Sequence, residues 1–154
     1  MKRIKTYRIE FIILVVDAST MGIILVAYDG SELAKKALHK AVDLLKQGDE
    51  LILAHVIPTT MIAEFVDIPP EVTTVKAHRL MNDALAMLKE KGVQATGLVR
   101  EGDIADTIIK IGTELEVAII VLGEKGVSKV DRFALGSVAD KVVKYARRPV
   151  LIVK

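Results

Sequence analysis

Short apolar runs alternate with amphipathic stretches along most of the chain. Apolar runs rich in β-branched residues are typical of strands buried in a parallel sheet, whereas apolar residues spaced three and four apart indicate helices. Stretches with helical spacing lie between the apolar runs that are rich in β-branched residues. We therefore predict five strands, at Ile23–Tyr28, Leu51–Val56, Val93–Arg100, Val117–Leu122 and Val150–Val153.

Capping residues, glycines and prolines predict where the helices begin and end. Ser31 and Asp103 each carry a side-chain oxygen that caps a helix amino end, and Pro149 cannot continue a helix. Glycine often follows the last helical residue. We expect helices from Ser31 to Gly48, from Pro69-Pro70 to Lys91-Gly92, from Asp103 through Ile111, and from Gly136-Ser137 to Pro149, with Val75 among the inward residues of the second.

The regular alternation of strands and helices predicts the architecture. Right-handed crossovers place each connecting helix on a face of a parallel sheet. We predict an α/β fold, a doubly wound five-stranded parallel sheet in the flavodoxin-like order 3-2-1-4-5, with helices on both faces. Such sheets bind ligands where the strand order reverses, here beyond the carboxyl ends of strands one and four. Those ends are Asp29 and Gly123.

Length and composition narrow the class of protein. A chain of 154 residues, 51% hydrophobic and 27% charged, is expected to contain one globular domain. It has no cysteine, which excludes disulfides, thiolate zinc sites and a cysteine nucleophile. The net charge of +2 is spread along the chain without a long basic run, so nucleic acid is not an expected partner.

The apolar segments near the amino end do not predict a membrane anchor. The run from Phe11 to Val16 is much shorter than the ~20 residues of a spanning helix. Cleavage of a signal peptide near Ala27 would remove the first predicted strand, so secretion is not expected. We predict a cytoplasmic protein that does not bind membranes.

Three glycines flank the segment after the fourth predicted strand. Gly123, Gly126 and Gly136-Ser137 have the spacing G-x2-G-x9-G-S. Glycines let backbone N–H groups approach phosphate oxygens, and a helix that begins near Ser137 adds unpaired N–H groups and its dipole. The charged side chains of the loop sum to one positive unit, so backbone donors are expected to dominate anion binding. The spacing is neither a Walker loop nor a G-x-G-x-x-G fingerprint.

This spacing resembles the ATP-binding branch of the universal stress protein family. The likeness extends to Ile24–Ser31 (ILVAYDGS), Leu53–Ile57 (LAHVI) and Pro149–Lys154 (PVLIVK). It implies an adenine nucleotide alpha hydrolase-like sheet with the same strand order, and an ATP-binding, nucleotide-dependent regulatory or stress-response protein. It also implies a homodimer in which the final strands Val150–Val153 meet. The implied nucleotide contacts are Ala27, Tyr28, Asp29, Val56, Gly123, Lys125, Gly126, Gly136, Ser137 and Val138.

The resemblance also implies roles within this set. Asp29 lies beside the base or the ribose and phosphates, and Ala27 and Val56 lie near the adenine. Asp29 also suits a magnesium ion held through water, and its alternative role is a turn residue before the first helix. The family often has Ser followed by His or Arg between the first two glycines, where this chain has Glu124-Lys125. A glutamate at that place opposes phosphate.

The residues leave three alternatives to a regulatory nucleotide-binding protein. Asp29, His55 and Ser137 include the residue types of a nucleophilic triad, although Ser137 lacks the G-x-S-x-G elbow. Weak ATP hydrolysis is the most that we expect of the chain as an enzyme, and we assign no catalytic residue. An apolar final strand at a sheet edge also suits a pure interaction module. The histidines at 39, 55 and 78 lack metal-ligand spacing, and we assign no metal-binding residue.

Residues 1–20 lie outside the family pattern. Met21 stands where such proteins often begin, so we assign residues 21–154 to the nucleotide-binding domain and residues 1–20 to an N-terminal extension. The extension is either an additional strand over Ile9 to Val16 or a mis-assigned start.

Overall fold

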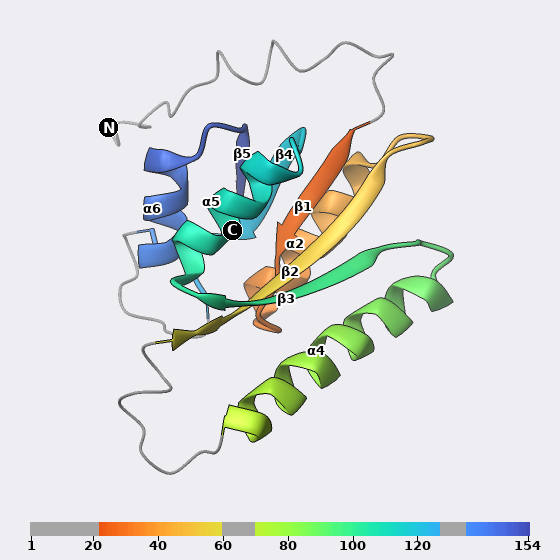
Figure 1. The fold of residues 1–154 in the computed structure, drawn as a ribbon. Coiled ribbons are helices and arrows are strands. Elements are labelled where there is room, and N and C mark those ends of the chain that lie inside the picture. The colour runs from red at the N-terminus through yellow and green to blue at the C-terminus, as the bar shows by residue number, and fades with distance from the viewer. Residues whose placement is uncertain (1–21, 60–69, 127–134) are drawn as a thin grey trace.

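The computed structural model of the protein describes residues 22–59, 70–126 and 135–154, which form a sheet between two layers of helices (Figure 1). The predicted extension, residues 1–20, lies outside the described residues. The strands are all parallel and lie in the order β3-β2-β1-β4-β5. The predicted doubly wound fold and its strand order are therefore confirmed.

Strands and helices alternate along the described chain. The strands are β1 (Ile23–Ala27), β2 (Glu50–Pro58), β3 (Thr96–Gly102), β4 (Ile119–Gly123) and β5 (Val150–Val153). The helices are α2 (Glu32–Leu44), α4 (Pro70–Glu90), α5 (Ile104–Glu114) and α6 (Ser137–Tyr145). No helix within these described ranges is long and apolar enough to cross a membrane. Because the strands are parallel, their carboxyl ends share one edge of the sheet, and the helices that follow them begin at that edge.

Helices cover both faces of the sheet (Figure 1). On one face α2 and α4 pack against the strands, in a core that includes Val26, Leu53, Val121, Leu38 and Leu88. On the other face α5 and α6 pack against a core that includes Leu25, Ile52, Ile120, Ile108 and Val142. β1 and β4, which lie in the middle of the sheet, contribute to both cores, as expected of strands with apolar residues on both sides.

Two predicted strand starts are wrong because the backbone groups there close helices. β3 begins at Thr96, since the Val93 N–H donates to the Leu88 carbonyl at 2.9 Å and ends α4. β4 begins after Val117, whose N–H donates to the Gly112 carbonyl at 3.1 Å at the end of α5. Both residues are apolar, so composition alone assigned them to strands.

Three further predictions, on α2, β2 and α4, are also corrected. α2 ends at Leu44, and Gly48, with φ 90°, lies in the turn that follows it. β2 continues through Pro58, because beyond Ala54 it pairs with β3 alone, and a proline is tolerated where a strand has one neighbour. On α4 Val75 is 58% exposed, so its predicted inward position is wrong.

Candidate functional site

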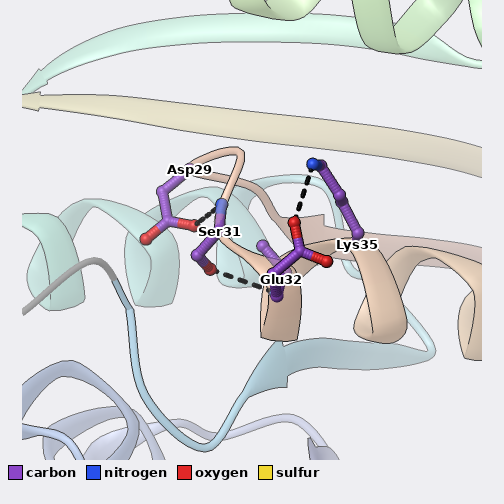
Figure 2. A network of polar contacts seen from close by, with 5 residues as sticks. Asp29, Ser31, Glu32 and Lys35 are labelled. Carbon is purple, nitrogen blue, oxygen red and sulfur yellow. Dashed lines mark hydrogen bonds and ion pairs between the residues drawn. The ribbon is translucent and has the colours of Figure 1, made fainter. Parts of the chain in front are cut away.

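Asp29 lies in a tight turn between β1 and α2 (Figure 2). Its Oδ1 accepts a hydrogen bond from the Ser31 N–H at 2.9 Å, and Gly30 has φ +78°, a conformation that favours glycine. Ser31 Oγ accepts from the Ala34 N–H at 3.1 Å and so caps α2, as predicted. The turn therefore holds Asp29 at the carboxyl edge of the sheet, next to the amino end of a helix.

Gly123 and Gly126 each lie so close to another residue that a Cβ would crowd it. A Cβ on Gly123 would lie 2.8 Å from the Leu33 Cβ, so the end of β4 packs directly on the first turn of α2. A Cβ on Gly126 would lie 2.8 Å from Asp29 Oδ2. The glycines of the described chain with positive φ are others, namely Gly30, Gly48, Gly92 and Gly102. The residues that follow β4 therefore lie against Asp29.

The two described ends of the glycine-flanked segment meet each other. The Gly136 N–H donates to the Glu124 carbonyl at 2.8 Å, and a Cβ on Gly136 would lie 3.2 Å from the Lys125 Cα. The Glu124 N–H donates to the Val153 carbonyl of β5, also at 2.8 Å. Both backbone groups of Glu124 are thus hydrogen-bonded within the protein. The hydrogen bond from Gly136 to the Glu124 carbonyl therefore holds the start of α6 beside the end of β4.

The amino end of α6 carries no side-chain cap in the described structure. Gly136 is the N-cap residue, and the Asp140 N–H makes the first bond of the helix, to the Gly136 carbonyl at 2.9 Å. The N–H groups of the first helical turn have no partner inside their own helix, which makes this end suitable for an anion. Ser137 is exposed and Val138 is half-buried.

Charged side chains near this end are engaged with one another. Glu124, whose side chain is 22% exposed, lies 3.9 Å from the Lys154 ammonium, measured from Oε1 to Nζ. Its carboxylate is thus drawn toward the end of β5. In the first turn of α2, Lys35 Nζ lies 3.0 Å from Glu32 Oε1 (Figure 2). Lys125 is half-buried between Glu124 and Gly126.

Three residues assigned to the site by resemblance divide between the two faces of the sheet. Ala27 and Val56 belong to the core on the α5 and α6 side, and Val56 is buried. The Tyr28 side chain is buried on the opposite side, between α2 and α4, and this burial raises the pKa of its phenol. The Tyr28 N–H donates to the Ala54 carbonyl, and its carbonyl lies 2.8 Å from His55 Nδ1. Tyr28 therefore shapes the turn from within the core.

The model of the universal stress protein family matches residues 21–154. The chain belongs to the universal stress protein family. No curated protein matches it.

Solved structures resemble this universal stress protein family member over most of its length. Hypothetical protein MJ0577 is 30% identical, with a TM-score of 0.76 over 86% of this chain and 95% of its own. A universal stress protein in complex with cAMP is 21% identical, with a TM-score of 0.68 over 88% of this chain and 99% of its own. The universal stress protein from Archaeoglobus fulgidus in complex with dAMP is 23% identical, with a TM-score of 0.66 over 88% and 98%.

The hydrogen bonds of this family member do not form a triad relay through His55 Nδ1. In a triad the acid accepts a hydrogen bond from the histidine ring. Here His55 Nδ1 faces the Tyr28 carbonyl and must donate to it, while Asp29 Oδ1 accepts from the Ser31 N–H. His55 is therefore held by the backbone that directly follows β1.

Several contacts of the site could not be predicted from the sequence. Leu33 sets the need for glycine at position 123, Val153 holds the Glu124 N–H, and Lys141 of α6 contacts two aspartates of α5, Asp103 and Asp106. Each contact joins segments far apart in the chain, so no local spacing predicts it. The only signals in the sequence were the glycine at position 123 and the positive charge of Lys141.

A separate groove of about 560 Å³ lies at the opposite edge of the sheet, at the amino ends of β2 and β3. Its lining combines acidic, basic and apolar side chains and includes Asp49, Glu50, Leu85, Lys89, Val93 and Thr96. The Asp49 carboxylate is occupied there by the N–H groups of Gly22 and Lys46, both at 2.9 Å. Within the described chain, no group of three or more His, Asp or Glu side chains is arranged to hold a metal ion.

Proposed function

We propose that the chain is an ATP-binding universal stress protein that acts as a nucleotide-dependent regulatory module in the cytoplasm. One observation carries the proposal: the two ends of the segment from Gly123 to Ser137 converge beside Asp29. Gly126 lies against Asp29 Oδ2, and Gly136 is hydrogen-bonded to Glu124. The uncapped end of α6 and the turn after β1 are thereby presented at the edge where doubly wound sheets bind their ligands.

In this proposal some residues donate hydrogen bonds to the phosphates, the glycines allow the backbone to approach closely, and others contact the base and ribose. The amides of Ser137 and Val138 and the Ser137 hydroxyl donate to phosphate oxygens, and Lys125 adds positive charge. Gly123, Gly126 and Gly136 keep the backbone close without donating through side chains. Gly136 itself already donates its N–H to Glu124, so it orients the site. Ala27, Asp29 and Val56 are proposed on the side of the base and ribose.

Adenine as the base is supported by two structures of the family that carry cAMP and dAMP. A triphosphate is supported by the spacing of the glycines, which provides donors on both sides of a long loop. Magnesium is included in the proposal because Asp29 places a carboxylate at the edge of the sheet proposed for the phosphates, and phosphate-bound magnesium keeps most of its waters and needs few carboxylates. A bound magnesium ion would supply positive charge to the phosphates.

Nucleotide content and titration test the proposal directly. Freshly purified protein is denatured, and the released small molecules are identified by mass spectrometry, with ATP, ADP or AMP expected. Calorimetry with ATP, ADP and AMP, with and without magnesium, then ranks the ligands. Absence of released nucleotide together with absence of heat for all three would refute adenine nucleotide binding.

Gly126→Ala is the sharpest single change at this site. The added Cβ would lie 2.8 Å from Asp29 Oδ2, so either the Asp29 side chain or the loop must shift. We expect the ATP affinity to fall about tenfold or more, the scale of losing a hydrogen bond to a charged group. Gly92→Ala is the matched control: with φ +75° and open space around it, the change strains a distant turn and lowers stability without changing affinity.

We propose that the protein binds ATP without rapid turnover. Hydrolysis of many ATP per minute that is lost in Asp29→Ala would contradict this.

We also propose a homodimer through Val150–Val153. The reason is that β5 lies at the edge of the sheet and its apolar side chains are each partly exposed.

A further inference from the structure

Lys141 of α6 is held between two carboxylates of α5. Its Nζ lies 3.1 Å from Asp103 Oδ1 and 2.8 Å from Asp106 Oδ1. The two helices lie side by side on the same face of the sheet (Figure 1). The contact therefore joins two elements that are separated along the chain by all of β4 and the glycine-flanked segment.

Asp103 is a fixed partner because it also caps α5. The same oxygen that meets Lys141 accepts the Asp106 N–H at 2.9 Å. This hydrogen bond and the Lys141 ammonium hold the pKa of Asp103 below its usual range, and the two carboxylates raise the pKa of Lys141. Asp103 directly follows β3, so the cluster is anchored at the carboxyl edge of the sheet.

Lys141 lies one turn along α6 from Ser137, and residues four apart share a helix face. The helix is also attached through the buried apolar residues Ala139 and Val142, and the Gly136 N–H joins its start to the Glu124 carbonyl. Apolar burial holds a helix against its neighbour but has little directionality. The ion pairs of Lys141 with Asp106 and with the capping residue Asp103 add direction close to the end of α6 that lacks a side-chain cap.

We propose that Lys141 is a positioning residue of the nucleotide site, which it serves by fixing the first turn of α6 against the amino end of α5. This inference rests on the proposed function, since the affected groups are the amides of Ser137 and Val138. Lys141 does not touch the nucleotide. It sets the direction in which those amides point.

Titration of ATP into four proteins tests this role. Lys141→Met keeps the aliphatic stem and removes the ammonium, and is expected to lower ATP affinity about fivefold or more, the scale of a modest coupling between sites. Lys141→Arg restores the cation and is expected to recover the affinity to within about twofold of the native protein. Lys144→Met is the matched control, because Lys144 pairs with Asp140 of its own helix at 2.6 Å, and its affinity should stay native.

A further variant separates positioning from simple charge. Lys141→Met leaves the Asp103 and Asp106 charges uncompensated near the phosphates, which also opposes an anion. Combining it with Asp103→Asn and Asp106→Asn removes all three charges, and positioning predicts that affinity stays low. Recovery of native affinity in the triple variant, or equal affinity of the methionine variant and the native protein, would overturn the inference. Failure of the native protein to bind any adenine nucleotide would instead refute the proposed function, so the two failures are distinguishable.

Discussion

A serine lies at the beginning of two helices of this protein, and its structural role differs between them. Ser31 Oγ accepts the Ala34 N–H and caps α2, whereas Ser137 is the first exposed residue of α6, whose N-cap is Gly136. The hydroxyl of Ser137 is therefore not needed for the helix itself. Under the proposed function this hydroxyl donates to a phosphate oxygen.

The same substitution is expected to separate these two roles. Ser31→Ala should lower the free energy of unfolding by about 1 kcal/mol, the usual cost of losing a cap. Ser137→Ala should leave that free energy within ~0.5 kcal/mol of native while ATP affinity falls about tenfold. Urea unfolding and calorimetry measure the two quantities. A Ser137→Ala variant that is destabilised yet binds ATP normally would assign this serine a purely structural role.

Sequence alone predicted these residues to different depths. The caps Ser31 and Asp103 were predicted correctly because capping is local, with donor and acceptor three residues apart. The glycine spacing was visible, but its cause was not. Gly123 meets Leu33, and Gly126 meets Asp29, across turns that no local spacing reveals.

At the scale of elements, α5 depends on a cap that also carries an ion pair. Asp103 accepts the Asp106 N–H and contacts Lys141, and both interactions stabilise its ionised form. Its pKa is therefore lower in the folded than in the unfolded chain, where it is about 3.9. The stability that this group supplies is present above that unfolded value and is lost as the pH falls through the lower folded value.

Asp103→Ala tests this dependence. At pH 7 we expect the free energy of unfolding to fall by about 1 kcal/mol through loss of the cap. The difference from the native protein should shrink as the pH is lowered below about 4, because the native carboxyl also becomes neutral. Urea unfolding at pH 7 and pH 3 measures it. Glu114→Ala, which removes an exposed pair with Lys110 at the other end of α5, is the control and should have little effect at either pH.

Element types were predictable here, but several element ends were not. Each predicted strand overlaps a strand of the structure, because covered parallel strands have a distinctive composition. Val93 and Val117 are apolar as well, yet their N–H groups close α4 and α5. Pro58 reads as a strand breaker, yet it ends β2 where one neighbour remains. These outcomes depend on which backbone groups find partners in the folded chain.

At the scale of the whole molecule, alternation and handedness predicted the parallel sheet, and the flavodoxin-like strand order, which the structure confirms, leaves β5 at an edge. Its four side chains are each partly exposed, and unpaired apolar edges favour association. We expect a mass near twice 16.8 kDa in light scattering. Ile152→Lys, which places a charge on this strand, should shift the mass toward that of one chain.

Circular dichroism of the Ile152→Lys variant shows whether it retains the fold. If it does not, the mass of the native protein decides the matter by itself. A native mass near 16.8 kDa at all concentrations would exclude association through β5.

The backbone of Glu124 is hydrogen-bonded on both sides, to β5 through its N–H and to the start of α6 through its carbonyl. Two successive amide planes that share the Glu124 Cα thus connect the outer border of the sheet with the place proposed for phosphate. A rotation at this Cα that suits one neighbour changes the fit of the other. Assembly and ligand occupancy would then bias each other, and thermodynamic reciprocity requires the factor to be the same in both directions.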